Sequence, residues 1–536
     1  MVADKEQMKF FISNITQTGK KFGKWHYFAD SKCKVLRHGD HMYIYFGYLV
    51  QGELETQIIE GYDSLHRANG SFTVVRLSAD RVDVIVDYFA RYKVFAQQKQ
   101  DLIEITNNFG LLTLTRKDID ISESSRRMAV PDEYVERPHL TNQRAGTWTD
   151  YTLDLKGVSA REYEPLAHRT IFKNVYLLEP GTQLTATDHV HRKKVIDYKN
   201  DFSSAFKERS RFDNATQLED YIHECMTNHA STIKKNYKHI HSTVSEGIDS
   251  VLQTMYFKDK AHSKSMYKFV PSMVPEQHKQ KIIEEFNDVY VEKFVLNKLD
   301  DYCKDHAKDP SCLDFDTLPT YLTIKNSERP IDMMMYGAGG DEVFLKRRKM
   351  VELQAIQMLL KEGRYNLVQR YNDYLYAHNT SYSARRNIDT TEGLRTLQEQ
   401  HKGLDWDNKF EDSLDYVCRQ FSFPEDIRDS TIPETLYWTL YCRQISTECD
   451  TEISSLYHDL NISYEVMKLP LKLRLESTVD VGLQRNILKR HWHFNFQTPY
   501  KDQAVFNTYK AIKPYYKSSI AHVLKDNLQQ LIDNEG

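Results

Sequence analysis

The stretch HIHSTVSEGIDSVLQTMYF, residues 239–257, decides the fold class. We interpret it as a strand, a tight turn and a helix in immediate succession, with Gly247 permitting the turn because glycine adopts conformations that ordinary side chains resist. The neighbouring segments continue the alternation, with a helix predicted at 218–236, a strand at 263–270 and a helix at 275–286. Strands that alternate with helices indicate a parallel sheet with helices on its faces.

The N-terminal part of the chain has a different pattern. Runs rich in β-branched and aromatic residues predict strands at 41–50 and 71–77, and residues 81–97 predict a hairpin that leads into another strand. At 175–186 a Pro-Gly pair predicts a turn between two strands. Such strands, bounded by Gly, Asn and Asp, indicate an antiparallel sheet system ahead of the parallel sheet.

Composition limits the classes of partner. The 536-residue chain has a formal net charge of -4 and 40% hydrophobic residues, enough to fill real cores. Because there is no global basic field, we expect no nucleic-acid partner. The chain has no apolar run of about 18 residues and no basic-then-apolar leader, so we expect a cytoplasmic protein without a membrane partner. The seven cysteines form no C-x-x-C pair, and we expect free thiols.

The turn at residues 244–250 has the chemistry of an anion site. The N–H groups at a helix start are unpaired, and together with the helix dipole they favour phosphate. Ser245 and Ser250 add hydroxyl donors, and Asp249 is an oxygen ligand suited to Mg²⁺. The alternative is a solvated strand-to-helix turn that is capped by Asp and Ser.

A second glycine-rich turn, YGAGGDEVF at 336–344, follows the apolar run IDMMMY. Gly337 and Gly339 allow close approach to the backbone. Asp341 can hold a metal ion from the side opposite Asp249, and Glu342 provides a second carboxylate. The alternative for this segment is a tight turn capped by acidic residues ahead of a helix.

Together, the two turns resemble motifs of the asparagine-synthetase family of AMP-forming amide ligases. The family's pyrophosphate loop reads S-G-G-x-D-S, and here it is SEGIDS. The second family motif reads G-E-G-[AS]-D-E-[LV]-F, and here it is GAGGDEVF. Patterns similar to the family's amidotransferase domain occur at 69–72, 87–95 and 170–181, and patterns similar to its closing motifs occur within 469–501.

The resemblance implies an α/β protein with two domains and a tail. Residues 1–200 are expected to form an α+β sandwich of the Ntn amidotransferase type, and 201–216 a linker. Residues 217–510 are expected to form a parallel-sheet ATP-pyrophosphatase domain, adenine nucleotide α-hydrolase-like, with a helical C-terminal part. Residues 511–536 are expected to be a helical tail. The ATP site would lie at the carboxyl ends of the parallel strands, where such sheets bind ligands.

The resemblance also implies a site and its ligands. ATP and Mg²⁺ are the expected cofactors, a small carboxylate with ammonia or an amine are the expected substrates, and a homodimer is among the expected assemblies. The expected nucleotide-binding residues are Val244, Ser245, Gly247, Ile248, Asp249, Ser250, Gly337, Gly339 and Asp341. The expected metal ligands are Asp249 and Asp341, and the expected catalytic residues are Arg485 and Glu342.

Five positions depart from the family pattern, and one of them is Lys489, which replaces an arginine. Val2 stands where the family has a cysteine that uses its own freed α-amine as base, so we expect no glutamine hydrolysis. Glu246 replaces the first loop glycine, and a carboxylate there repels phosphate unless it points away or contacts the metal. Ala338 replaces the glutamate of the second motif. Arg485 falls where the family has a lysine, which changes reach and donor geometry.

Two functions are therefore open at this point. The first is an asparagine-synthetase-like ligase that adenylates a carboxylate, releases pyrophosphate and transfers the acyl group to ammonia or an amine, without its own glutaminase. The second is a catalytically degenerate relative that keeps the fold as a nucleotide-binding or interaction protein. The retained Asp249 and Asp341 favour the first function, whereas Glu246 and Ala338 favour the second.

Overall fold

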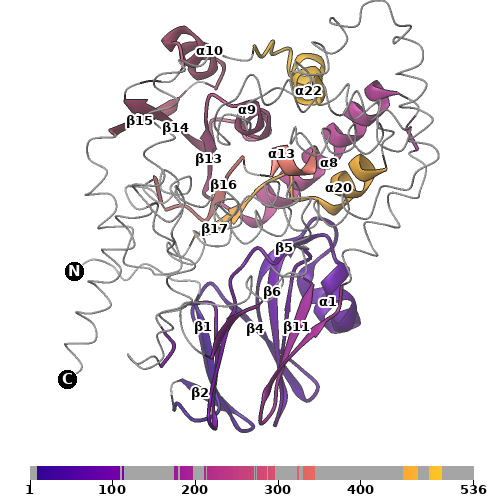
Figure 1. Cartoon of the computed structure of the whole chain (residues 1–536), viewed down its shortest axis with the longest axis vertical. Helices are drawn as coiled ribbons and strands as arrows, with labels where there is room; N and C mark the ends of the chain where they lie inside the picture. Colours follow the sequence, from indigo (N-terminus) through magenta and orange to yellow (C-terminus); the bar gives the residue numbers. More distant parts are fainter. Residues whose placement is uncertain are drawn as a thin grey trace, which may run out of the picture.

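The chain folds as a mixed α/β protein, and its described residues form two antiparallel sheets and one parallel sheet (Figure 1). The strands of the antiparallel sheets lie between Phe10 and Lys194, and those of the parallel sheet lie between Ile240 and Ser454. The mixed α/β class predicted from the sequence is confirmed. The computed structural model describes residues 9–17, 19–108, 111–113, 174–178, 181–196, 211–212, 214–270, 272, 274–286, 288–295, 323–324, 327, 330–337, 339–344, 451–468 and 482–497.

The two antiparallel sheets pack face to face. The first has the order β10-β8-β9-β1-β3-β2, with strands β1 (Phe10–Ser13), β2 (Lys20–Phe22), β3 (Trp25–Ala29), β8 (Phe95–Lys99), β9 (Leu102–Thr106) and β10 (Val175–Leu177). The second has the order β12-β11-β7-β6-β5-β4, with strands β4 (Lys34–His38), β5 (His41–Leu49), β6 (Gly70–Leu77), β7 (Val82–Val86), β11 (Thr182–Ala186) and β12 (Val190–Lys194). One buried apolar cluster joins Ile12 and Trp25 of the first sheet to Ile44 and Val75 of the second, as in a β-sandwich.

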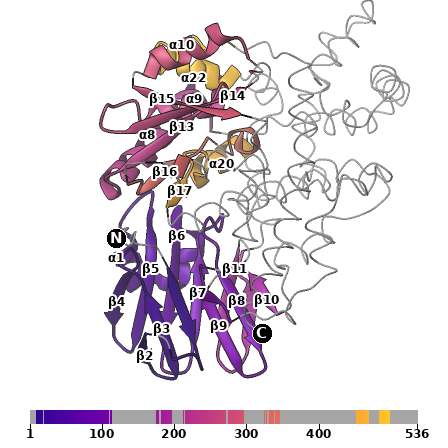
Figure 2. The same ribbon diagram turned by 90° about the vertical axis from the view of Figure 1, so that its left-hand side faces the viewer.

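A helical segment covers the outer face of the second sheet. It consists of α1 (Leu54–Gly61) and the 3₁₀ turn η1 (Tyr62–Arg67), and α1 lies beside β5 (Figures 1 and 2). Leu54 and Leu65 of this segment are buried against Tyr43 and Phe72. The described residues of the N-terminal part therefore form three layers: the first sheet, the second sheet and a short helical layer.

The predicted hairpin at 81–97 is wrong, because β7 and β8 belong to different sheets. The connection between them crosses the sandwich and is organised by Asp87, which accepts hydrogen bonds from the N–H groups of Phe89 and Arg91, both at 3.0 Å. Ala90 has a positive φ of 47° in this connection, a conformation that favours glycine. The two strands that flank the Pro-Gly pair at 175–186 also lie in different sheets.

The parallel sheet has the strand order β15-β14-β13-β16-β17. Its strands are β13 (Ile240–Val244), β14 (Ser263–Val270), β15 (Val289–Val295), β16 (Met333–Met335) and β17 (Glu452–Ser454). Helix α8 (Ala215–Asn236) precedes β13, and α9 (Ile248–Met255) and α10 (Glu276–Phe286) lie between the next strands along the chain. The other described helices are α13 (Gly340–Val343) after β16, and α20 (Leu460–Met467) and α22 (Gly482–Trp492) after β17. All four strand pairs are parallel, which confirms the alternation predicted around residues 239–257.

The helices bury apolar faces against the parallel sheet. Ile222 and Met226 of α8 share one core with Val251 of α9 and Ile487 of α22. Helix α8 begins at Ala215, slightly before the expected domain start at residue 217, and the Asn214 side chain caps it. The helices that the structure describes include no candidate for a membrane-spanning segment.

Buried polar contacts join the sandwich to the parallel sheet. The Tyr48 hydroxyl lies 2.8 Å from His229 Nε2 and 2.6 Å from Ser454 Oγ, and Arg91 Nη1 donates to the same Ser454 oxygen at 3.1 Å. Burial lowers the pKa of His229 to about 3, so its ring is neutral. Polar groups buried without partners are costly, so these contacts favour one arrangement of the two parts.

A second set of contacts surrounds the edge strand β17 and the segment that follows it. The Glu452 carboxylate accepts hydrogen bonds from the hydroxyls of Tyr92 and Tyr237. Asn69 donates to Asp459 Oδ1 at 2.9 Å and accepts from the Leu460 N–H at 3.1 Å. The segment after β17 is therefore held by side chains of the sandwich.

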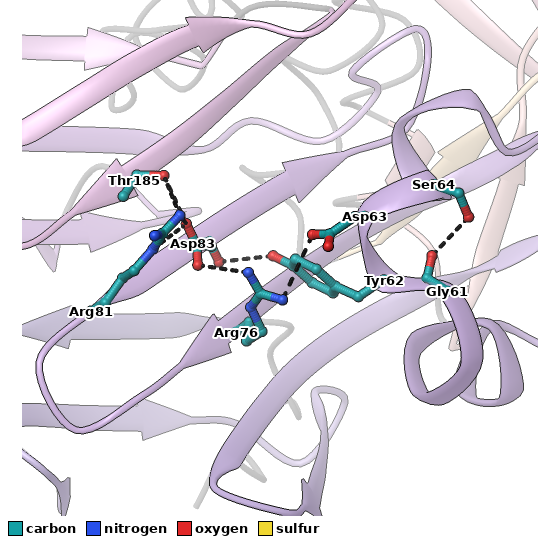
Figure 3. Close-up of polar contacts among 8 residues, drawn as sticks. All are labelled: Gly61, Tyr62, Asp63, Ser64, Arg76, Arg81, Asp83 and Thr185. Atoms are coloured by element: carbon teal, nitrogen blue, oxygen red, sulfur yellow. Dashed lines mark hydrogen bonds and ion pairs between the residues drawn. The ribbon is translucent and has the colours of Figure 1, made fainter.

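The sandwich also contains a buried carboxylate that is held by two arginines (Figure 3). Asp83 lies on β7 with its side chain 1% exposed, and it pairs with Arg76 at 3.0 Å and Arg81 at 2.7 Å. Thr185 of β11 donates to it at 2.7 Å, and the Arg76 guanidinium also stacks 4.0 Å from the Tyr62 ring centroid. Burial alone would raise the pKa of Asp83, but the hydrogen bonds from Arg81, Thr185 and Arg76 outweigh it and lower the pKa.

We expect Asp83→Asn to destabilise the protein by about 1–2 kcal/mol at pH 7, because it removes charge-assisted hydrogen bonds from a buried position. A carboxyl group whose pKa is lowered by folding stabilises the protein above its unfolded pKa of about 3.9, and this contribution is lost as pH falls toward the folded pKa. Urea unfolding at pH 7 and pH 3 measures this effect. The difference in unfolding free energy between Asp83→Asn and wild type should be smaller at pH 3 than at pH 7. Asp188→Asn, at an exposed pair with Lys24, is the control and should unfold like wild type.

Candidate functional site

The turn between β13 and α9 is organised by its own hydroxyl groups. The Ser245 N–H donates to Ser250 Oγ at 2.8 Å, and the two hydroxyl oxygens lie 2.8 Å apart. The Gly247 N–H donates to Ser245 Oγ at 3.1 Å. Gly247 has φ -86°, which any residue adopts, so the turn does not need the glycine conformation that we expected. Val244 and Ile248 are buried on either side of the turn and anchor it in the core.

The second glycine-rich turn lies directly against the first. A Cβ added at Gly337 would stand 2.7 Å from Ser250 Cα and 2.8 Å from its backbone nitrogen. One added at Gly340 would stand 2.5 Å from Asp249 Oδ1. The contact follows from the topology, because β13 and β16 are neighbouring parallel strands and both turns leave from their carboxyl ends. The structure thus brings the two predicted motifs together at one edge of the sheet.

Part of the second motif lies outside the described residues. This applies to Ala338 and to the side chains of Asp341 and Glu342, an expected metal ligand and an expected catalytic residue. The backbone of Asp341 and Glu342 belongs to α13, which begins against Asp249 at Gly340. Within the described side chains, no group of three or more His, Cys, Asp or Glu residues is arranged to hold a metal ion.

Asp249 is held by two residues that are distant in the sequence. The Gln484 side chain, which is fully buried, donates a hydrogen bond from Nε2 to Asp249 Oδ1. The Tyr457 hydroxyl donates to the Asp249 carbonyl at 2.6 Å. No sequence pattern signals either contact, since both depend on how α22 and the segment after β17 pack against α9. Arg485, expected to be catalytic, is half-buried and directly follows Gln484 on α22.

His458 packs between Gly339 of the second turn and the sandwich. The φ of Gly339 is +95°, and a Cβ there would stand 2.7 Å from His458 Nε2, so both conformation and space require glycine. The His458 ring centroid lies 5.5 Å from that of Phe89 in the sandwich. Burial lowers the pKa of His458 well below its usual value, so the ring that faces the turn is neutral. The N-terminal part therefore contacts the histidine that packs against the second turn.

Glu246, the residue that departs from the family loop, is directed toward α10. Its Oε1 lies 3.1 Å from Lys279 Nζ, and the side chains are 13% and 1% exposed, respectively. The Glu246 carbonyl oxygen also lies 3.3 Å from His278 Nε2. The charge of the carboxylate is therefore compensated by a lysine that no sequence motif indicates.

The assembled site has hydroxyls, a helix start and a carboxylate within one pair of turns. Ser245 and Ser250 supply hydroxyl groups, α9 supplies the N-terminal end of a helix dipole, and Asp249 supplies a carboxylate beside Gly340. Such an arrangement suits a phosphate group and a hard cation. Comparison with known proteins adds nothing to this geometry, because no family model matches the chain and the search of curated proteins finds no significant match.

Proposed function

We propose that the chain is an ATP-dependent, AMP-forming amide ligase of the asparagine-synthetase type. The observation that carries the proposal is the contact between the two glycine-rich turns, with Gly337 against Ser250 and Gly340 against Asp249. The family resemblance rests on these turns, and a ligase of this type requires them to form one cleft. Their position after neighbouring parallel strands is where open α/β sheets bind ligands.

In the proposed reaction, Ser245, Gly247 and Ser250 bind the β- and γ-phosphates of ATP at the start of α9. A substrate carboxylate attacks the α-phosphate, and pyrophosphate leaves. Ammonia or an amine then attacks the acyl adenylate, loses a proton, and AMP leaves with both electrons of the acyl–oxygen bond. Arg485 would stabilise the charge that develops on the phosphate and the acyl oxygen, and Glu342 would orient the reacting groups.

A magnesium ion, when bound, would neutralise charge on the phosphate oxygens. Asp249 fits this role, because carboxylate oxygens are ligands that Mg²⁺ prefers and its side chain lies beside Gly340 of the second turn. The hydrogen bond from Gln484 also fixes the orientation of the carboxylate. Asp341 is the second proposed ligand. We further propose that ammonia or the amine arrives free rather than from glutamine hydrolysis within this chain.

A second candidate function is nucleotide binding without turnover. The observation that favours it is the same hydrogen bond from Gln484, since an amide on Asp249 Oδ1 competes with a metal ion for that oxygen. Ala338 also removes a carboxylate that the family uses next to the acyl adenylate. A missing base would affect the amine attack more than adenylation, because the amine must lose a proton.

The test is a panel of amino acids and other small carboxylates, with and without amines, that is assayed for AMP and pyrophosphate release from ATP. The ligase proposal predicts equimolar AMP and pyrophosphate with at least one carboxylate, over many turnovers. Absence of release from every carboxylate, with ATP binding unchanged by Asp249→Ala, would contradict it. Binding of ATP with Mg²⁺ but no turnover would establish the second candidate.

A further inference from the structure

Lys279 is a buried cation that contacts the turn between β13 and α9 from outside the predicted motifs. It lies in the first turn of α10, with its side chain 1% exposed and its Nζ 3.1 Å from Glu246 Oε1. These two atoms are close enough for an ion pair but not aligned for a hydrogen bond. Among the described residues, neither atom has a hydrogen-bond partner.

The arrangement leaves the ammonium group poorly satisfied. An ammonium has three N–H donors and no acceptor, and its burial is costly unless those donors find oxygen atoms. The attraction to Glu246 offsets part of that cost, but it does not replace directed hydrogen bonds. An additional anion with several acceptor oxygens at this turn would complete the coordination of Lys279.

The turn and α10 are held together at this point by more than the ion pair. His278, next to Lys279, contacts the Glu246 carbonyl oxygen at 3.3 Å, and its ring centroid lies 5.5 Å from that of Phe496. Glu246 directly precedes Gly247, the residue that caps the start of α9. The buried ammonium is therefore attached to the same turn whose helix end attracts anions.

We infer that Lys279 is the cationic group of a polyphosphate site at this turn, and that Glu246 occupies it as an internal competitor until a polyphosphate binds. The inference rests on the proposed function. It adds Lys279 to the phosphate-binding residues and predicts how changes at Lys279 and Glu246 alter polyphosphate affinity. The ligand class is a diphosphate or triphosphate chain, whose oxygens would take up the N–H donors of Lys279. Glu246 would then turn away from the ammonium or share it.

The inference predicts opposite effects from the two halves of one ion pair. Glu246→Gln keeps the side-chain size but removes the competing charge, so polyphosphate should bind several-fold more tightly. Lys279→Met removes the cation, so binding should weaken by about tenfold or more, the scale of one charge-assisted hydrogen bond. The double variant should bind more tightly than Lys279→Met, because it also removes a carboxylate that has lost its counter-charge, and less tightly than Glu246→Gln, because it lacks the cation. A purely structural ion pair predicts instead that both single variants lower stability and neither changes affinity.

The experiment is calorimetric titration of the full-length chain with magnesium pyrophosphate and with ATP in the presence of Mg²⁺, with thermal unfolding to establish that each variant is folded. Lys258→Met is the matched control, since Lys258 pairs with Glu285 of the same helix α10, and it should bind like wild type. If Lys279→Met does not fold, Lys279→Gln replaces it, and Glu246→Gln tests the inference independently.

The outcomes separate this inference from the proposed function. Tighter binding by Glu246→Gln together with weaker binding by the Lys279 variant supports the inference. A different result overturns only the inference. In that case wild type binds polyphosphate and Asp249→Asn binds it less tightly, but the affinities of the Glu246 and Lys279 variants equal that of wild type or change in the same direction. If wild type binds neither ligand, the inference and the proposed function both fail.

Discussion

Replacing Asp249 by Asn is expected to reduce AMP formation by about a hundredfold to a thousandfold, because metal-assisted charge neutralisation contributes several kcal/mol to such reactions. Asn preserves the size and one oxygen of the side chain, so the packing against Gly340 should persist. The loss should appear in kcat/KM for ATP and should not be recovered at saturating ATP. Steady-state pyrophosphate release, with the carboxylate identified in the panel, measures it.

The matched control is Asp259→Asn in the same part of the molecule. Asp259 is 68% exposed and pairs with Lys234 on the surface, away from the two turns. This variant should keep wild-type activity, because exposed ion pairs contribute little. Equal activity of both variants would show that the Asp249 carboxylate has no part in the reaction.

Gly337→Ala is expected to damage the contact between the two turns directly. The new Cβ would stand 2.7–2.9 Å from three atoms of Ser250, two of them backbone, and backbone cannot rotate out of the way. Overpacking of this kind costs about 1–3 kcal/mol, and here it also separates the two turns. We expect a loss of about 2–3 kcal/mol in unfolding free energy and at least about tenfold weaker ATP binding.

Gly61→Ala is the control for this substitution. Its Cβ would meet the side-chain ends of Gln57 and Ser64, which are exposed and can move. It should change stability much less than Gly337→Ala and leave ATP binding unaltered. Urea unfolding and calorimetric titration provide both readouts. Similar ATP affinity in Gly337→Ala and wild type would contradict the idea that the contact between the turns forms the site.

The sequence predicts those features that depend on neighbours along the chain. The strand, turn and helix at 239–257 are such a feature, because the spacing of apolar residues depends on local structure. The mixed α/β class follows from the same alternation. The sequence at 81–97 could not show whether its two strands pair in a hairpin or belong to different sheets, because both arrangements need two strand-like runs. What distinguishes them here is the hydrogen bonding of Asp87 and the positive φ of Ala90.

The contacts around the site were not predictable, since they join segments far apart in the chain. Gln484 and Asp249 are 235 positions apart in the sequence. A glutamine with no motif around it is expected to be exposed rather than buried in a site. Lys279 lies in no recognisable motif. Glu246 is unusual for a phosphate loop, but its identity does not indicate which cation compensates its charge. In the structure, that cation is the buried Lys279 of α10. The domain boundaries and the assignment of Asp341, Glu342 and Arg485 as site residues stay predictions.

The most direct measurement is hydrogen–deuterium exchange of the full-length chain with and without ATP and Mg²⁺. If the two turns form one triphosphate site, ATP with Mg²⁺ should slow exchange both in peptides covering 240–255 and in peptides covering 331–344, and chelation of Mg²⁺ should reverse it. Slowed exchange in only one of these segments, or in neither while ATP is bound, would contradict the account.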